Sequence, residues 1–266
     1  MVKKIVGTGV LLVLALALQA GVKMYTLKSP DGKVKLEVTA GQGIAYSLFY
    51  DGRLLLKPSR IALHTDLPEA DHWENIRITG TKQRHVSETV QAPFYRVKEF
   101  GIDCNELELR LNNGFSLLMR AYNDGMAYRF VAGRKGEMTV VEERAEFNFA
   151  DDFEAYIPYS TNPKDPWNMA FQNFYTKAPL TQYNTELPAF LPLTVDAGAV
   201  KLTLLESDLE AYPGMFVRGD GKTPALKGVF AAYPQETFKN KWRCQETVKT
   251  RRPYIARVAG KRTFPW

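Results

Sequence analysis

Tight turns separate short runs of alternating apolar and polar residues along most of this chain. The stretch from Arg120 to Phe130 shows the pattern most completely, because Asn123-Asp124-Gly125 interrupts two such runs. The apolar residues on each side of the turn would share one face of a strand: Phe115, Leu117 and Met119 before it, and Met126, Tyr128 and Phe130 after it. Asn, Asp and Gly tolerate the positive φ values of hairpin turns. The stretch therefore predicts a β-hairpin with one buried face.

The same rhythm predicts strands on both sides of this hairpin. They are expected over residues 33–39, 45–50, 53–56, 89–100, 106–111, 200–206, 215–217, 227–231 and 254–258. Helical periodicity is nearly absent. Many short strands joined by Gly, Asn and Pro turns are typical of two packed antiparallel sheets. The sequence therefore predicts an all-β fold, a large antiparallel β-sandwich, and 266 residues are compatible with one large domain.

The first residues differ from the rest of the chain. Lys3 and Lys4 precede an uncharged run from Ile5 to Leu18, which is shorter than the roughly 18–20 residues that span a bilayer. This pattern predicts a signal peptide over residues 1–20, with cleavage after Ala20. A periplasmic or secreted protein without a stable membrane anchor is expected. An uncleaved anchor or a buried strand is the alternative.

The charge pattern argues against a nucleic-acid partner. The formal net charge of +6 falls if Lys3 and Lys4 leave with the signal peptide, and the remaining charges alternate in sign. The densest basic stretch, from Lys239 to Arg252, contains few aromatic side chains that could stack on bases. A solvated sheet face or a docking face explains this stretch better than phosphate binding does.

Cysteine and histidine offer no metal site. Cys104 and Cys244 are the two cysteines, and an exported pair could form a disulfide or remain as two buried free thiols. His64, His72 and His85 lack the close spacing of zinc ligands, and there is no Cys-x-x-Cys. A zinc site is therefore not expected.

Residues 158–192 lack sustained alternation and are dense in Pro, Asn, Tyr and Phe. Long irregular loops in compact domains are usually functional or disordered, and the aromatic content argues against disorder. The loop aromatics would mostly pack onto the sandwich, with one or two facing sugar: Trp167, Phe171, Phe174, Tyr175 and Tyr183. An exposed Trp167 would suit carbohydrate, because aromatic faces pack against the apolar C–H surface of pyranose rings.

Several blocks of the chain resemble one protein family in the same order. They are the hairpin at 120–130, Ser29–Lys33, Phe190–Leu193, Glu206–Met215 and Gly260–Trp266. Together they resemble the N-terminal domain of glycoside hydrolase family 97, the calcium-dependent α-glucosidases and α-galactosidases of bacterial polysaccharide-utilisation systems. The resemblance implies a galactose-mutarotase-like super-sandwich over residues 21–266. In the family a catalytic (β/α)-barrel follows, and this barrel is expected to be absent from the chain, whether the chain is a gene fragment or a separately encoded domain.

Glycoside hydrolysis ordinarily needs two carboxyl groups on opposite sides of the scissile bond. Two acidic clusters occur, and both are interpreted as solvated or docking carboxylates: Asp151, Asp152 and Glu154, and Glu206, Asp208 and Glu210. No catalytic residue is assigned, because the resemblance places the catalytic carboxylates in the barrel. The expected function is an active-site-shaping, carbohydrate-binding domain of an exo-acting α-glycosidase, with the barrel and an α-linked oligosaccharide as partners. The alternative is a stand-alone carbohydrate-binding β-sandwich module without catalysis. Glucoside or galactoside, and retaining or inverting chemistry, stay open.

The resemblance also implies a Ca²⁺ cofactor shared with the barrel, with a loop of this domain offering a glutamate oxygen. The matching position here is Gln172, followed by Asn173 as in the family. An amide oxygen can ligate calcium but brings no negative charge, so weaker calcium binding is expected. Gln172 is therefore the candidate metal ligand, with an ordinary loop amide as the alternative, and Trp167 and Asn173 are the candidate substrate-binding residues.

Overall fold

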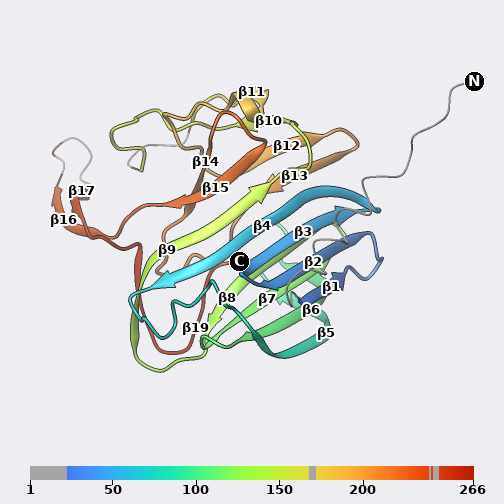
Figure 1. The fold of residues 1–266 in the computed structure, drawn as a ribbon. Helices are drawn as coiled ribbons and strands as arrows, with labels where there is room; N and C mark the ends of the chain where they lie inside the picture. Colours follow the sequence, from blue (N-terminus) through green and yellow to red (C-terminus); the bar gives the residue numbers. More distant parts are fainter. Residues whose placement is uncertain (1–22, 168–171, 240, 242–245) are drawn as a thin grey trace, which may run out of the picture.

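The computed structural model describes residues 23–167, 172–239, 241 and 246–266. Strands account for nearly all of the regular structure in these ranges (Figure 1). The predicted signal peptide lies outside the described residues. Among the residues that are described, no helix has the length and apolar character needed to cross a bilayer.

Two large antiparallel sheets form the body of the fold. The first has the order β1 (Lys23–Lys28), β2 (Val34–Gly41), β3 (Gly43–Tyr50), β4 (Arg53–Thr65), β9 (Glu137–Asn148), β15 (Ala225–Phe230) and β14 (Met215–Gly219), with β18 (Ala256–Ala259) also paired to β9. The second has the order β19 (Arg262–Thr263), β8 (Gly125–Ala132), β7 (Phe115–Tyr122), β6 (Glu99–Leu111) and β5 (Ile78–Gln91). In Figure 1 the first sheet runs diagonally across the front, and the second lies against its lower half.

Smaller sheets extend this body. Above it in Figure 1 lie β11 (Thr176–Pro179), β10 (Glu154–Ile157), β12 (Leu193–Ala197) and β13 (Val200–Leu204). The ribbon of β16 (Pro234–Lys239) and β17 (Glu246–Arg251) stands at the left edge. A short 3₁₀ helix, η1, covers Leu180–Gln182. The predicted all-β class and packed antiparallel sheets are confirmed.

The core lies between the two large sheets, because each sheet turns one set of alternate side chains inward. Leu36 and Val38 of β2 are fully buried, and so are Leu117 and Met119 of β7. Aromatic contacts join the layers: Tyr46 of β3 lies 5.7 Å from Tyr128 of β8, ring centre to ring centre. Burial of alternate apolar residues is the main stabilising contribution to such a sandwich.

The predicted hairpin at 120–130 is confirmed. β7 and β8 pair in register from Phe115 opposite Ala132 to Tyr122 opposite Gly125. Phe115, Leu117, Met119 and Phe130 are buried, while Met126 and Tyr128 are half-buried and pack against the core. The turn Asn123-Asp124 also contacts another element, because Asn123 Oδ1 accepts a hydrogen bond from the Asp31 amide at 3.0 Å.

The strand predicted over residues 89–100 is wrong. β5 ends at Gln91 and β6 begins at Glu99, and the Ala92 amide donates to Lys98 O at 2.7 Å across the intervening turn. Pro93 cannot donate a ladder hydrogen bond, which favours a turn at this point. The segment is the tip of a long hairpin.

Candidate functional site

The loop at 158–192 is closed at its neck by backbone contacts. The Ser160 amide donates to Pro188 O at 2.9 Å, and the Phe190 amide donates to Pro158 O at 3.1 Å. Ala189 also pairs with Val217 of β14, which ties the neck to the large sheet. Most of the loop is irregular, as the sequence predicts, although β11 and η1 lie within it. The neck gives the loop a fixed origin on the sandwich.

Asn173 fastens the far part of the loop to this neck. The half-buried Asn173 side-chain amide donates to the backbone oxygen of Tyr159. The neighbouring Gln172 is exposed, and its side chain makes no hydrogen bond to another described residue. The two predicted site residues therefore lie beside the neck, one anchored and one facing solvent.

The exposed aromatic residue beside this pair is Phe174, not Trp167. Trp167 is half-buried, and its ring packs edge-on against Phe216 at 4.8 Å. Phe174 is 99% exposed, and Tyr175 is 45% exposed with its hydroxyl donating to Pro192 O at 3.2 Å. Trp167 thus takes the packing role expected of most loop aromatics. Phe174 offers a free ring, and Phe171 lies outside the described residues.

Tyr183 lies within the loop and anchors it to β14 of the large sheet. Its side chain is buried, its hydroxyl lies 2.8 Å from Val217 O, and its ring packs edge-on against Tyr159 at 5.0 Å. Burial raises the pKa of the Tyr183 hydroxyl, so it remains a neutral donor. Gly219 makes room for the ring, because a Cβ there would lie 2.7 Å from Tyr183 Cγ.

The described residues do not form a calcium site by themselves. Calcium takes 6–8 oxygen ligands, and among the residues placed by the structure no group of three or more His, Cys, Asp or Glu could hold a metal ion. Gln172 could supply one exposed amide oxygen. Cys104 is a buried free thiol, while its possible disulfide partner Cys244 lies outside the described residues.

Carboxylates from both acidic clusters make structural contacts. Asp152 accepts hydrogen bonds from the Thr181 amide at 3.0 Å and from its hydroxyl at 2.6 Å. Glu206 accepts from the Met215 amide at 2.7 Å, and Asp208 pairs with Arg129 at 2.9 Å. These contacts tie turns to the sandwich, which supports the structural interpretation of these acids.

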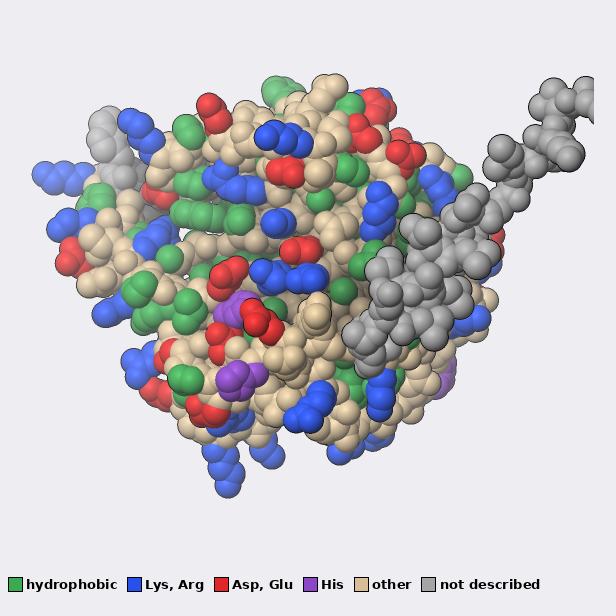
Figure 2. Space-filling model, viewed as in Figure 1, with side chains coloured by type: hydrophobic (Ala, Val, Ile, Leu, Met, Phe, Trp, Pro, Cys, Tyr) green, Lys and Arg blue, Asp and Glu red, His purple; other side chains and the backbone are tan. Residues whose placement is uncertain are grey.

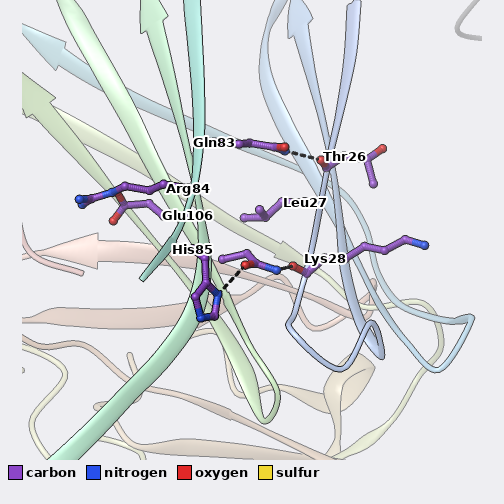
Figure 3. A pocket seen from close by; sticks show the side chains of 8 residues that line it. Thr26, Leu27, Lys28, Gln83, Arg84, His85 and Glu106 are labelled. Carbon is purple, nitrogen blue, oxygen red and sulfur yellow. Dashed lines mark hydrogen bonds and ion pairs between the residues drawn. The ribbon is translucent and has the colours of Figure 1, made fainter. Parts of the chain in front are cut away.

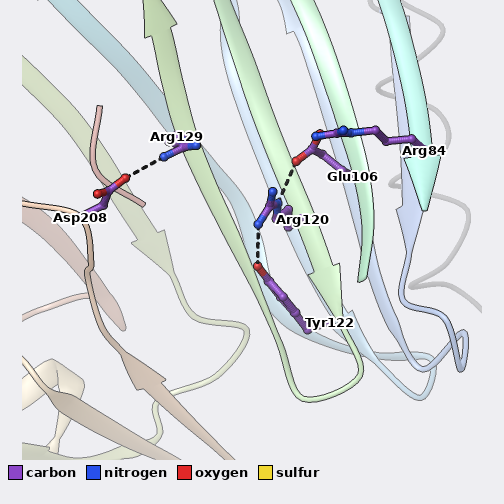
Figure 4. Close-up of polar contacts among 6 residues, drawn as sticks. All are labelled: Arg84, Glu106, Arg120, Tyr122, Arg129 and Asp208. Atoms are coloured by element: carbon purple, nitrogen blue, oxygen red, sulfur yellow. Dashed lines mark hydrogen bonds and ion pairs between the residues drawn. The ribbon is translucent and has the colours of Figure 1, made fainter. Parts of the chain in front are cut away.

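A charged network lies on the face of the second sheet that points away from the core, here called the outer face (Figure 4). Glu106 of β6 is buried between Arg84 of β5, at 2.7 Å, and Arg120 of β7, at 2.8 Å. Burial acts to raise the pKa of Glu106, but the two arginines together hold it below its ordinary value. Arg120 also donates to the Tyr122 hydroxyl at 3.4 Å.

Trp266 lies on the same outer face. The guanidinium carbon of Arg129 lies 4.1 Å from the ring centre of Trp266, and that of Arg120 lies 4.7 Å away. The backbones of Trp266 and Ser207 exchange two hydrogen bonds, at 3.1 and 3.2 Å. Cation–π contacts of this kind contribute about 0.5–2 kcal/mol each. The end of the sequence is therefore fixed on the outer face.

A groove of about 480 Å³ lies between the edge strands β1 and β5, beside β6 (Figure 3). Gln83 donates to Thr26 O at 3.0 Å, and Asn105 donates to Lys28 O at 2.9 Å. These amides satisfy carbonyl groups of β1 and so protect an edge strand from pairing with another chain. None of the eight lining residues is Phe, Tyr or Trp, so the groove lacks the large aromatic face on which a sugar ring stacks.

Glu143 of β9 is half-buried and lies close to acidic and phenolic groups. Its carboxylate accepts a hydrogen bond from the Tyr212 hydroxyl at 2.6 Å. Loss of solvent raises the pKa of Glu143 to about 7, with Tyr212 opposing the rise and the nearby Glu206 adding to it. Because an unfolded Glu titrates near about 4.3, the native state binds the extra proton between these values.

We predict that Glu143→Gln stabilises the protein at pH 8 and much less at pH 5. The protonated Glu143 contributes stability that is complete below about pH 4 and lost as the pH rises through about 7. Replacing the carboxylate by an uncharged amide removes this loss, so the free energy of unfolding at pH 8 is expected to rise by on the order of 1–3 kcal/mol. Urea unfolding at both pH values measures it. Glu142→Gln, on the exposed side of β9, is the control, and equal behaviour of the two variants would contradict the prediction.

The surface mixes charges of both signs. Figure 2 shows Lys and Arg side chains interspersed with Asp and Glu over the visible face, with no single basic field. In the basic β16–β17 ribbon, Lys249 pairs with Glu236 at 3.2 Å, and Arg251 approaches Asp165 at 4.0 Å. Acidic side chains thus offset part of the basic charge of this ribbon.

Comparisons with known proteins give the family. The model of the glycosyl-hydrolase 97 N-terminal family matches residues 27–266. A retaining alpha-galactosidase of Bacteroides thetaiotaomicron is 39% identical over 259 residues, which are 94% of this chain and 39% of that protein. A probable retaining alpha-galactosidase of Streptomyces bingchenggensis is 26% identical over 158 residues, 58% of this chain and 24% of that protein. The chain thus spans no more than two fifths of the length of these curated relatives.

Solved structures share the fold. A glycoside hydrolase family 97 enzyme from Pseudoalteromonas sp. strain K8, in complex with acarbose, superposes with a TM-score of 0.70 at 16% identity, over 91% of this chain and 34% of that one. A beta-arabinopyranosidase gives 0.71 at 20% identity, over 91% and 39%. The sheets, the resemblance of the sequence blocks and the family match agree: the chain belongs to the N-terminal domain family of glycoside hydrolase family 97.

Proposed function

We propose that this chain is the N-terminal, active-site-shaping domain of an exo-acting retaining α-galactosidase. The galactoside preference is supported by the two curated relatives, which are named as retaining or probable retaining alpha-galactosidases. The described acidic clusters make structural contacts, so the catalytic carboxylates are assigned to the part of the enzyme that lies beyond the matched region. We also propose that the protein is exported through a signal peptide at residues 1–20.

The loop at 158–192 carries this proposal. Its neck is fixed to the large sheet, and Asn173 holds Gln172 and Phe174 beside that neck with their side chains exposed. A fixed loop with a free ring and a free amide can form one wall of a sugar pocket, since such pockets combine apolar surface with a few placed polar groups. Trp167 contributes by packing its ring against Phe216 of β14, which holds this part of the loop on the large sheet.

A chimera tests the role of the loop. In it, this chain replaces the matched region of the Bacteroides thetaiotaomicron relative. Phe174→Ala is expected to raise KM for an aryl α-galactoside about fivefold, because loss of one ring contact costs roughly 1 kcal/mol. Phe238→Ala, which removes another exposed ring in β16, is the control and should leave KM unchanged. Equal KM values for both variants would contradict the proposed role.

A stand-alone carbohydrate-binding module is the second candidate, favoured by the exposed Phe174 ring. Calorimetric titration of the chain with melibiose and maltose distinguishes the two. Dissociation constants of about 1 mM or tighter would support the module, whereas a domain that forms only one wall of a pocket should bind more weakly.

Gln172→Glu is expected to strengthen calcium binding in the chimera and to change little in the chain alone. We propose that Gln172 offers its side-chain oxygen to a calcium ion whose other ligands come from the catalytic part. Calcium affinity follows ligand charge, and one oxygen cannot make a site with 6–8 ligands. Calcium titration of both proteins with either residue measures the effect. Unchanged affinity in the chimera would show that residue 172 does not face the metal.

A further inference from the structure

The hairpin of β5 and β6 extends beyond the rest of its sheet. β7 pairs with β6 only between Cys104 and Arg110, whereas β5 pairs with β6 as far as Glu99. Residues 87–103, here called the overhang, therefore form a two-stranded ribbon with a tip at 92–98. A two-stranded ribbon is at best marginally stable in water unless it packs against another structure.

The overhang is amphipathic, and its apolar side continues the outer face. Val90 lies opposite Phe100, and these side chains are 41% and 43% exposed. They alternate in step with Val86 and Cys104, which lie next to the Glu106 network. The Tyr95 ring at the tip packs edge-on against Phe100 at 6.3 Å. A contiguous exposed apolar strip of this kind marks an interaction site.

The opposite side of the overhang is polar. Gln91 donates to Glu99 at 2.9 Å, and Asp103 pairs with His85, which lies just before the overhang, at 3.0 Å. The overhang therefore does not extend the core between the sheets. Its apolar side faces away from the sandwich, so a partner that covers it would lie outside the described part of the sandwich.

The position of Trp266 identifies that partner. Trp266 stacks on Arg120, which is paired to Glu106, and Phe100 lies six residues along β6 from Glu106, about 20 Å at 3.3–3.4 Å per residue. The strip and Trp266 share the outer face. In the Bacteroides thetaiotaomicron relative, the matched N-terminal region makes up 39% of the protein, so a larger catalytic part follows the position of Trp266. A catalytic part that follows Trp266 would therefore begin on the same outer face as the overhang.

We propose that the apolar side of the overhang, with Val90, Tyr95 and Phe100 at its centre, is a docking surface for the catalytic domain. The inference rests on the proposed function, because its partner is the catalytic part of the same enzyme. Docking would bury the strip and stabilise the ribbon, as obligate interfaces do by covering apolar surface. A carbohydrate ligand suits the strip less well, since Glu88 is the one polar side chain among its paired outer positions, whereas sugar sites combine rings with several placed polar groups.

Binding of this chain to the separately produced catalytic part of the Bacteroides thetaiotaomicron relative tests the proposal. Val90→Ser/Phe100→Ser is expected to weaken the complex tenfold or more, while Thr89→Ala/Gln91→Ala on the polar side leaves it unchanged. Amide exchange at residues 87–91 and 99–103 should slow tenfold or more in the complex. The thermal midpoint of the free chain checks that each variant folds, and Tyr95→Ser at the tip replaces the double variant if that variant does not.

Three results would overturn the proposal. They are equal binding by the two double variants, unchanged amide exchange of the overhang in the complex, and absence of binding by the unmodified chain. Self-association of the chain that Val90→Ser/Phe100→Ser abolishes would assign the strip to a second copy instead. Hydrolysis by the chimera tests the proposed function separately, because the two parts are covalently joined there. An active chimera in which the amides of the overhang exchange as fast as in the free chain would reject the docking surface alone.

Discussion

Glu106→Ala is expected to lower the free energy of unfolding by about 3 kcal/mol. The side chain of Glu106 is 5% exposed and pairs with two arginines, and Arg120 is itself only 13% exposed. Removing the carboxylate leaves a largely buried guanidinium without its partner, a change that typically costs 3–5 kcal/mol. Partial exposure of Arg84 places the expected value at the lower end. Urea unfolding followed by circular dichroism measures the loss.

Glu108→Ala provides the matched control for Glu106→Ala. Glu108 lies on the same strand and face, but it is more exposed and 3.7 Å from Arg110, so a loss of at most about 0.5 kcal/mol is expected. The depressed pKa of Glu106 adds a pH signature. The stability that ionised Glu106 contributes is present above about pH 4.3 and is lost as the pH falls through its folded pKa. The unfolding free energies of the two variants should therefore converge in acid. Equal losses at neutral pH would show that the outer-face network is not stabilising.

Gly219→Ala is expected to destabilise the protein by about 2–3 kcal/mol. The new Cβ would lie 2.7 Å from Cγ and 2.8 Å from Cβ of Tyr183, and these atoms sit close to the backbone, where a rotamer change relieves little. Overpacking of a filled core costs about 1–3 kcal/mol. Because Tyr183 supports the loop at 158–192, the variant should also lower hydrolysis by the chimera.

Gly101→Ala is the control for Gly219→Ala. Nothing lies within 4 Å of a Cβ at Gly101, so its unfolding free energy should stay within about 0.5 kcal/mol of the starting protein. Thermal and urea unfolding of both variants give the comparison. A loss of less than about 0.5 kcal/mol for Gly219→Ala would mean that Tyr183 moves freely and does not fix the loop.

The sequence predicted the strands whose alternation is regular. β2 and β7 were predicted because their inward residues are apolar and most of their outward residues are polar. β5 was missed, since Val86 is its one buried residue and the strand has no apolar period to detect. β9 was missed for another reason: its register shifts between the His64–Glu142 and Thr65–Val140 pairs, so the inward positions change from even to odd along the strand.

The candidate site was predictable in place but not in detail. Its composition located the loop at 158–192, and the family pattern located Gln172 and Asn173. The orientation of each aromatic side chain depends on distant partners. Trp167 packs because Phe216 of β14 lies beside it, while Phe174 has no such neighbour and is 99% exposed. Nothing local in the sequence distinguishes these two rings, because both lie in a segment without regular apolar alternation.

Hydrolysis of nitrophenyl α-galactoside by the chain and by the chimera tests the central claim most directly. The chain alone should release no nitrophenol above background, because its described acidic clusters make structural contacts. The chimera, with this chain in place of the matched N-terminal region of the Bacteroides thetaiotaomicron relative, should hydrolyse the α-galactoside and prefer it over the α-glucoside. Turnover by the chain alone that survives rigorous purification, or a folded chimera without α-galactosidase activity, would contradict the claim that this chain is the N-terminal domain of such an enzyme.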